Sequence, residues 1–594
     1  MENEKPKRRL KKRFVTPVAV VLLLLVAAPF IVLAVSKAFT AQETVVRSDW
    51  AIDTGEVLGS DASLGIEFAE ADLNSDQLRV IRLVPTDIEE DGFTFYDSAV
   101  QDRLDQALES LKGMGMAWTA TNPLAVLNPY GTGANGLYLY FETDVAAHVT
   151  YTVHVEDEDI PDFTATAAEA DGQPNTRTHE IQIIGLVPGE TNTVTLEIVG
   201  SWGNLRQNVS FTIEMPETES GYDTTLEVTD GPAAEEAQAE GLFTMMRVNG
   251  YLGYGFLYDD AGVLRYEMVL EGYGLDRVLF DDGDIITCVS ATKLARINGL
   301  GRVEQVYDLG EWALHHDIGF GTDGEILALA ERTGAETVED QMLSIDIETG
   351  EVTHLIDFTE TLADYYAMTR PINATDPFFW QAGEWDWIHL NSLQYLPEED
   401  SVIVSSRETS TIMKFTDIHG TPTLDWLAGD TDFWADTPYA SYCLAQDGAF
   451  VPQYGQHCVE YLAAGDTAGV YYLAVYNNNY WALSSRDDYE PDLADTVGTD
   501  LYGLGHEESQ VYVYKIDENA RTFSLEQSFD VPYSSIVSNG SQIGDSGHWA
   551  VNSGISMVFG EYNADGELIR EYAYDCTMQN YRTFKYDYSG FWFA

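Results

Sequence analysis

Residues 384–410, EWDWIHLNSLQYLPEEDSVIVSSRETS, contain the unit that decides the fold. Apolar residues alternate along two short runs on either side of the turn at 397–400, which predicts an antiparallel pair of strands. A similar strand, acidic turn and strand recur at 256–268, 346–358, 417–429 and 561–574. Repeats spaced by roughly 40–75 residues are typical of β-propeller blades with four strands each. The hairpins in 242–594 allow five to seven blades, and six fits best.

Three of these hairpins carry a histidine at the start of their first strand. The segments 315–331, 389–407 and 457–477 align with one another on His315, His389 and His457. Because the first strand of a propeller blade lines the central channel, we expect the three histidines at one rim of that channel. His316 takes the place of His315 if that strand begins one residue later.

The hairpin of His389 also contains an asparagine and an arginine. Asn391 lies two residues after His389 and should point the same way, since alternate residues of a strand share a face. Arg407 ends the second strand, which returns antiparallel and brings this residue beside His389. The alignment places Asp317 at the position of Asn391, and Glu331 at the position of Arg407.

Two chemistries suit three histidines in a channel. Imidazole is a common ligand of Zn²⁺-type and Mn²⁺-type ions, and Asp317 or Glu331 would add a carboxylate, so a metal-dependent lyase or hydrolase is one hypothesis. Alternatively, one histidine is a nucleophile and the others are donors or acids around an anion. Arg407 favours the anion, because its planar guanidinium matches a sulfate or phosphate group and is repelled by a metal cation. A third hypothesis is a non-catalytic, membrane-anchored propeller that binds a partner.

A second domain is predicted before the propeller, at 45–215. Residues 96–115 have apolar side chains at helical spacing and end in glycine, so they predict one amphipathic helix. From residue 127 the period changes to two, with Gly, Pro and Asn in the turns, which is typical of a small antiparallel β-sandwich. The polar stretch 216–241 is predicted to be a linker. The fold class is therefore all-β, with a six-bladed propeller preceded by a small β-sandwich and a transmembrane helix.

The N-terminus has the pattern of a membrane anchor. Residues 1–13 form a basic tail, with seven basic residues in 5–13, and 14–36 contain no charge over 23 residues. A helix of that length spans a bilayer, and the positive-inside rule places the tail in the cytoplasm. We therefore expect a single-pass protein of the cell membrane with an extracellular catalytic domain. Secretion after cleavage of a signal peptide is the alternative.

The rest of the composition limits the partners. The formal net charge is −67, which disfavours nucleic acid as a partner because phosphate binding needs clustered Lys and Arg. Disulfides are permitted outside the cell, and Cys443 and Cys458 are the closest pair of the four cysteines. They are the candidates for a bridge.

Several motifs resemble the bacterial arylsulfate sulfotransferase family, over roughly residues 120–594. In the sandwich these are NPYGTG and THEIQIIGLVPGETNTVTL, which begin at residues 128 and 178. In the propeller they are HHDI, DWIHLNSLQYLPEEDSVIVSSR and GQHC, which begin at residues 315, 386 and 455. The His-x-Asn pair followed by the arginine makes the resemblance fairly specific.

The resemblance implies a six-bladed enzyme outside the cytoplasm that moves a sulfuryl group from a phenolic sulfate to a phenol. It implies a ping-pong mechanism without a nucleotide donor or other cofactor, in which His457 becomes a sulfohistidine. His389, Arg407 and either His315 or His316 would bind the sulfuryl group and handle protons. We expect Asn391, Tyr454 and Trp387, which lie near the motifs, to contact the substrate.

Two features depart from the family pattern. The family has a disulfide near the nucleophile, and the spacing of Cys443 and Cys458 matches it only loosely. The membrane anchor is absent from the soluble periplasmic members, and it suggests a cell with one membrane.

Overall fold

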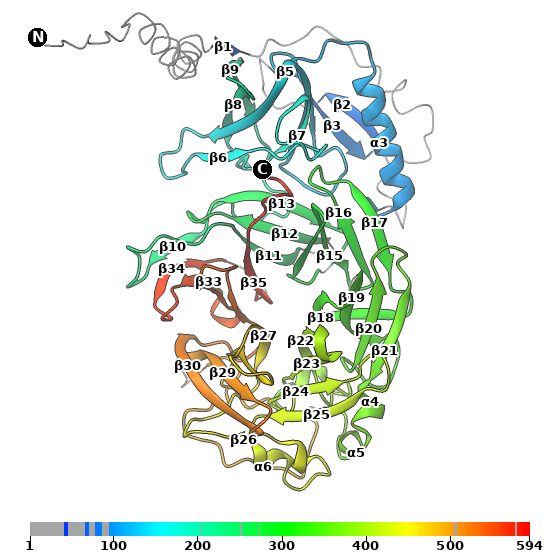
Figure 1. Cartoon of the computed structure of the whole chain (residues 1–594), viewed down its shortest axis with the longest axis vertical. Helices are drawn as coiled ribbons and strands as arrows, with labels where there is room; N and C mark the ends of the chain where they lie inside the picture. The colour runs from blue at the N-terminus through cyan, green and yellow to red at the C-terminus, as the bar shows by residue number, and fades with distance from the viewer. Residues whose placement is uncertain are drawn as a thin grey trace, which may run out of the picture.

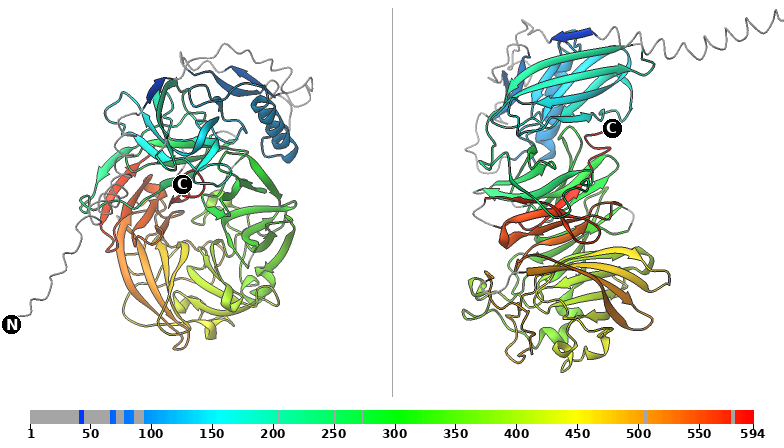
Figure 2. Two further views of the ribbon diagram at one scale, coloured as in Figure 1. Left: turned by 45° about the horizontal axis from the view of Figure 1, so that its top comes forward. Right: turned by 90° about the vertical axis from the view of Figure 1, so that its left-hand side faces the viewer.

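The computed structural model describes residues 41–44, 66–70, 78–85, 94–203, 205–249, 252–272, 274–322, 324–503, 508–575 and 579–594. Within them the chain forms a smaller N-terminal domain and a ring of six sheets, which are the blades of a propeller (Figures 1 and 2). The predicted membrane segment 14–36 lies outside these residues. No helix in the described part of the chain has the length and apolar character needed to cross a membrane.

The N-terminal domain is built around one long strand, β5 (Leu137–His154). Its partners are β4 (Leu124–Leu127), β6 (Phe163–Thr166), β7 (Thr176–Ile183) and β8 (Thr191–Gly200). The sheet is extended by β9 (Arg206–Glu214) and β1 (Ala41–Thr44) on one side, and by β3 (Val80–Pro85) and β2 (Ile66–Glu70) on the other. Alternate residues of β8, such as Val194, Leu196 and Ile198, are fully buried. The period-two pattern from residue 127 therefore predicted the strands from β5 onward. It did not predict β1 to β4, and the sheet is not wholly antiparallel, because β1 pairs with β9 and β3 with β4 in parallel.

One helix, α3 (Ser98–Lys112), covers part of this sheet. Asp97 caps its first turn, where the carboxylate accepts hydrogen bonds from the backbone N–H groups of Ala99 and Val100. Leu104 and Leu111 are among the residues on its buried face. The helix predicted from the sequence is confirmed.

The six blades follow one another along the chain. The first contains β11 (Leu242–Asn249), β12 (Leu252–Tyr258), β13 (Leu264–Leu270) and the C-terminal strand β35 (Thr583–Tyr586). The second contains β14 (Val278–Asp281), β15 (Asp284–Ser290), β16 (Lys293–Ile297) and β17 (Val303–Asp308). The third contains β18 (Trp312–Phe320), β19 (Glu325–Arg332), β20 (Gln341–Asp346) and β21 (Val352–Asp357). The fourth contains β22 (Leu390–Leu396), β23 (Ser401–Ser406), β24 (Thr411–Thr416) and β25 (Thr423–Ala428).

The last two blades each carry a fifth strand at the outer edge. One contains β27 (His457–Ala464), β28 (Val470–Asn477), β29 (Glu508–Asp517), β30 (Thr522–Pro532) and the short β26 (Ala445–Gln446). The other contains β31 (Asn539–Gln542), β32 (Trp549–Ser553), β33 (Val558–Tyr562), β34 (Leu568–Ala573) and β10 (Glu227–Asp230). Part of the stretch 216–241 thus belongs to the edge of a blade, because β10 pairs with β34.

Short helical segments lie in the connections between strands. They are α4 (Phe358–Thr361), α5 (Ala363–Tyr366), α6 (Thr431–Trp434) and the 3₁₀ turns Phe379–Gln381, Pro397–Glu399, Ala440–Tyr442 and Gly554–Ser556. Two long connections matter for the site. One runs from β21 to β22, and the other runs from β28 to β29.

The ring closes because β35 pairs with β11. Within this closing strand the Lys585 ammonium is fully buried, and it lies 2.6 Å from Asp260 Oδ1 and 2.7 Å from Glu561 Oε2. A buried ammonium group is tolerated only with such partners, so this ion pair fastens the last strand into the first blade.

The strands β18, β22 and β27 are the innermost strands of three consecutive blades, as the alignment of the histidine hairpins predicted. Polar groups connect them across the blade boundaries. The backbone N–H of Leu393 donates to Asp317 Oδ2 at 3.0 Å, and the amide of Asn391 donates to the carbonyl of Gln456 at 2.8 Å. The starts of these strands are therefore held at a common level of the channel.

Candidate active site

The predicted histidines meet in one buried cluster. The ring centroids of His316 and His389 are 4.7 Å apart, those of His315 and His316 are 5.1 Å apart, and those of His389 and His457 are 6.4 Å apart. The backbone N–H of Arg407 donates to the carbonyl of His389 at 3.1 Å, so the arginine lies beside this histidine as predicted. His316 contacts His389 and Tyr581 directly, whereas His315 adjoins the cluster through the ring of His316.

The backbone is irregular where these residues lie. The φ angles of His316, His389 and Cys458 are +58°, +47° and +51°, in the left-handed region that non-glycine residues seldom adopt. The strand pairing also shifts at these points of β18, β22 and β27. Such strain occurs most often at functional sites, where the surrounding structure compensates for it.

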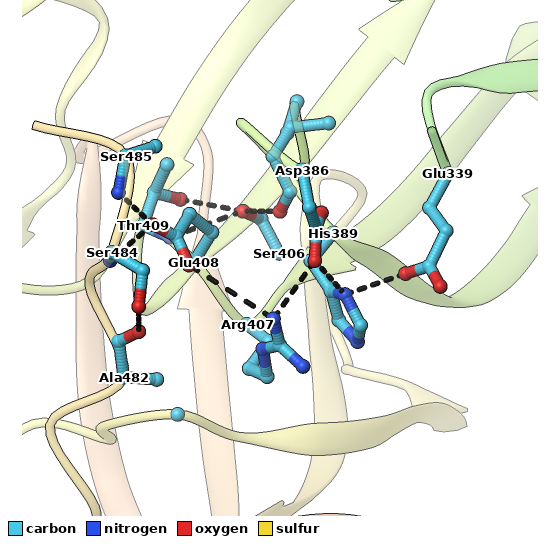
Figure 3. A network of polar contacts seen from close by, with 12 residues as sticks. Glu339, Asp386, His389, Ser406, Arg407, Glu408, Thr409, Ala482, Ser484 and Ser485 are labelled. Carbon is cyan, nitrogen blue, oxygen red and sulfur yellow. Dashed lines mark hydrogen bonds and ion pairs between the residues drawn. The ribbon is translucent and has the colours of Figure 1, made fainter. Parts of the chain in front are cut away.

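Two carboxylates that the sequence analysis missed organise the charges (Figure 3). Asp386 Oδ2 is 2.6 Å from His389 Nδ1 and accepts a hydrogen bond from Arg407 Nη2 at 2.9 Å. Glu339 Oε2 approaches the same His389 nitrogen at 2.5 Å. Asp386 is three residues before His389, whereas Glu339 comes from the preceding blade.

His389 is a cation at neutral pH. Burial and the nearby Arg407 charge lower the pKa of its imidazole, but the carboxylates of Asp386 and Glu339 outweigh them and raise this pKa to about 9. Since Nδ1–H faces the carboxylates, Nε2–H is the proton that His389 can offer to a ligand.

His457 has the opposite character. Burial, followed by the positive charge of His389, holds the pKa of its imidazole well below the usual value, so the ring is neutral. Its Nδ1 lies 2.8 Å from Asn478 Oδ1 and 3.1 Å from the carbonyl oxygen of Gly455.

The amide of Asn478 fixes the tautomer of His457. Its Nδ2 donates to the carbonyls of Ser534 at 2.7 Å and Val537 at 2.9 Å, which leaves Oδ1 to face the histidine. Because both neighbours of His457 Nδ1 are oxygens that accept, Nδ1 carries the proton and Nε2 carries the lone pair. The sequence gives no signal for this partner, which lies 21 residues after His457.

Arg407 is held from three sides. Asp386 binds Nη2, the ring of Phe378 lies 4.0 Å from the guanidinium carbon, and Glu408 Oε2 is 4.0 Å from Nη2. Within the described residues, its buried Nε has no hydrogen-bond partner. A buried donor of this kind is available to an anionic ligand.

Glu408 ties the site to the connection between β28 and β29. Its Oε1 accepts hydrogen bonds from the backbone N–H groups of Ser484 and Ser485 (Figure 3). Burial raises the pKa of this carboxyl to about 7. The connection that is fixed in this way begins with Asn478, the partner of His457.

Tyr581 and Arg582, directly before the closing strand, also border the cluster. The sequence analysis did not predict either residue. The Tyr581 ring centroid lies 5.2 Å from that of His316 and 6.4 Å from that of His457. The Arg582 guanidinium donates to the carbonyl of Asn391. Their approach depends on ring closure, which brings the end of the chain to the third and fourth blades.

Three residues expected to contact substrate have other contacts. Trp387 is fully buried among apolar side chains and its indole N–H donates to Asp340 Oδ2 at 2.8 Å, so it packs in the core of its blade, and its contact with substrate stays a prediction. Tyr454 is buried, and its hydroxyl donates to Asp430 Oδ2 at 3.1 Å. Asn391 uses its amide to hold the backbone of Gln456, directly before His457.

Asp317 and Glu331, the carboxylates that the alignment suggested for a metal site, have other surroundings than a metal site would require. Asp317 Oδ1 accepts from Arg277 at 2.7 Å and from Arg582 at 2.9 Å, so it is already neutralised. Burial, followed by the negative charge of Glu339, raises the pKa of Glu331 to about 7. The carboxylates that reach the histidines are those of Glu339 and Asp386.

The predicted disulfide is not formed. Cys443 and Cys458 are free thiols, as is Cys288, and Cys576 lies outside the described residues. Cys458 Sγ faces Ser541 Oγ at 3.8 Å, in the neighbouring inner strand β31, whereas Cys443 follows a 3₁₀ turn beside β25. The two side chains belong to different environments, and their proximity in sequence was misleading.

The fold and the site define a six-bladed propeller with a neutral histidine close to cationic donors on the adjacent blade. The family model described as "Arylsulfotransferase (ASST)" matches residues 227–587, and the model "Arylsulfotransferase Ig-like domain" matches residues 124–216. The chain therefore belongs to the arylsulfotransferase family, and its N-terminal domain is Ig-like. None of the curated proteins compared with the chain matches it.

Solved structures show only a distant likeness. A putative 6-phosphogluconolactonase from Bacteroides uniformis ATCC 8492 has a TM-score of 0.30 and 9% identity, over 74% of this chain and 97% of that chain. A second one, from Bacteroides fragilis NCTC 9343, has a TM-score of 0.32 and 10% identity, over 74% of this chain and 98% of that chain. The WD40 domain of Toxoplasma gondii coronin has a TM-score of 0.29 and 9% identity, over 59% of this chain and 76% of that chain.

The pKa of His389 predicts a pH dependence of stability. A folded-state pKa of about 9 exceeds the usual histidine value of 6.5, so the stabilisation is complete below pH 6.5 and is lost as the pH rises through 9. The free energy of unfolding of the wild type, relative to the His389→Gln variant, should fall by at most about 3 kcal/mol over this window. Denaturant titrations at several pH values measure it, with the exposed His154→Gln variant as control. A constant difference between pH 6.5 and 9 would contradict the assigned charge of His389.

Proposed function

We propose that this arylsulfotransferase moves a sulfuryl group from a phenolic sulfate ester to a phenol in two steps, through a sulfohistidine at His457. The observation that carries the proposal is the tautomer of His457. Its Nδ1–H is bound by Asn478, so the Nε2 lone pair of a neutral ring is available, while His389 presents a proton. A neutral nucleophile and a cationic acid on adjacent blades suit attack on an anionic ester.

In the first step, His457 Nε2 attacks the sulfur of the donor. The S–N bond forms as the S–O bond to the aryl group breaks, and the bonding pair leaves with the phenolic oxygen. His389 Nε2–H donates its proton to that oxygen. Asp386 and Glu339 then face a neutral imidazole, which can accept a proton in the next step.

In the second step, the acceptor phenol gives its proton to His389 and its oxygen attacks the sulfur. The S–N bond breaks, the electron pair returns to His457 Nε2, and a new aryl sulfate leaves. No water or cofactor enters the balance. Each fixed donor to the sulfuryl oxygens, Arg407 first among them, is expected to contribute roughly 3 kcal/mol to the stability of the transition state.

We also propose that the catalytic domain lies outside the cytoplasm on an uncleaved anchor at 14–36. The seven basic residues in 5–13 followed by 23 uncharged residues support this topology. The full chain should sediment with membranes and resist alkaline extraction, and protease added to intact cells should remove the propeller. Recovery of the chain from the culture medium would instead support the cleaved form.

A transfer assay tests the proposed reaction. A chromogenic aryl sulfate should release its dye phenol only when an acceptor phenol is present, and a His457→Asn variant should lose this release while keeping its melting temperature. The exposed His154→Asn variant serves as control and should retain full activity. More than about a tenth of the activity in the His457 variant would exclude His457 as the covalent residue. Absence of release by the wild type would favour a binding module.

Arg407→Lys tests whether the guanidinium grips two sulfuryl oxygens. Lysine keeps the charge and loses the planar fork, so kcat/KM should fall by roughly ten- to a hundredfold, or about 1.4–2.7 kcal/mol. High salt should change this ratio little, because screening acts on long-range attraction more than on a buried contact. If the lysine variant has wild-type activity at low and high salt, Arg407 does not have this role.

A further inference from the structure

Two imidazoles converge on one oxygen of Glu339. His389 Nδ1 lies 2.5 Å from Glu339 Oε2, and His316 Nε2 lies 3.0 Å from the same atom. The first contact is explained by the positive charge of His389. The second brings the half-buried imidazole of His316, from β18, to the same carboxylate oxygen. In the sulfuryl-transfer mechanism Glu339 acts only together with Asp386, as an anion beside His389. Its negative charge would also repel a sulfate ester.

His315 lies beside this pair and is poorly provided with polar partners. It is 8% exposed, and within the described residues neither ring nitrogen makes a well-aligned hydrogen bond, although the backbone of Ala330 lies close to the ring. A buried polar group without a partner costs about 1–3 kcal/mol, so its presence requires an explanation. Its ring lies 5.1 Å from that of His316, centroid to centroid.

We infer that His315, His316 and Glu339 form a binding site for a divalent transition metal of the Zn²⁺ class. One ligand atom from each of the three residues lies within 4.8 Å of the others, at sites that are buried or half-buried. Two imidazole nitrogens and one carboxylate oxygen are a ligand set that Zn²⁺ prefers, and they leave a fourth position open. A metal there satisfies His315 and neutralises Glu339.

His389 shares Glu339 with the proposed metal site, which links the metal to the reaction. Glu339, Asp386 and His389 have ligand atoms within 4.8 Å of one another, so a metal bound to Glu339 lies close to His389. The metal withdraws Glu339 from His389 and places a dication next to the proton donor. The metal is therefore expected to inhibit sulfuryl transfer reversibly, and this consequence rests on the function proposed above.

The test begins with binding and requires no activity. The full chain, treated with chelator and dialysed, is titrated with Co²⁺ and then with Zn²⁺ alone. The visible absorption of four-coordinate Co²⁺ should appear at one equivalent, and Zn²⁺ should displace it. Glu339→Gln and His315→Asn should each weaken binding at least tenfold, whereas His457→Asn, which is inactive by the proposed mechanism, should bind normally. Melting temperatures identify a variant that fails to fold. If one of the two ligand variants does not fold, the other still tests the site.

The outcomes separate this inference from the proposed function. No stoichiometric Co²⁺ or Zn²⁺ binding, or binding unaffected by Glu339→Gln, overturns the site. If the metal binds and the wild type transfers sulfuryl groups, stoichiometric Zn²⁺ should inhibit and chelator should restore the rate. Loss of activity on chelation would overturn the inhibitory role. An inactive metal-free wild type that still binds Co²⁺ at these residues would refute the sulfuryl-transfer proposal and leave the metal site standing.

Discussion

The site depends on one carboxylate oxygen, Oδ2 of Asp386, which lies 2.6 Å from His389 Nδ1 and 2.9 Å from Arg407 Nη2. All three side chains are buried, and an isolated buried charge costs several kcal/mol. The carboxylate therefore keeps His389 protonated and holds the guanidinium in place, while the two cations make the buried carboxylate tolerable. His457, which lacks a carboxylate partner among the described residues, stays neutral on the next blade. One interaction thus separates the charge states of the proton donor and the nucleophile.

The same interaction explains how an acidic protein can bind an anionic substrate. A net charge of −67 creates a field that disfavours aryl sulfates. Within the channel, His389 and Arg407 supply positive charge at the point where the sulfuryl group is expected, and burial strengthens their attraction because screening by water is weak there. The acidic Glu339 is the exception, and a metal ion that neutralises it would account for its position.

Much of the architecture could be predicted from local rules. The antiparallel pairing of two strands in a hairpin predicted that Arg407 lies beside His389. The repetition of this hairpin predicted that three histidines lie on neighbouring inner strands. Asp386 and Glu339 could not be found in the same way, because acidic residues occur throughout this chain and only the irregular backbone turns these two inward. The core packing of Trp387 could not be predicted either, since proximity in sequence to His389 does not determine which side of the blade a residue occupies. Asn478 reaches the cluster at the start of a long connection between strands, and Tyr581 reaches it because the ring closes. Neither feature can be predicted from the periodicity of the sequence.

The central claim is that His457 Nε2 carries the sulfuryl group between the two substrates. The most direct measurement is mass spectrometry of the peptide that contains His457, after exposure of the protein to an aryl sulfate without acceptor and an alkaline quench. The account predicts that this peptide gains the mass of one sulfuryl group, with fragment ions locating it on His457, and that addition of a phenol removes it. An unmodified peptide in a protein that is active in transfer, or a sulfuryl group on another residue, would contradict the account.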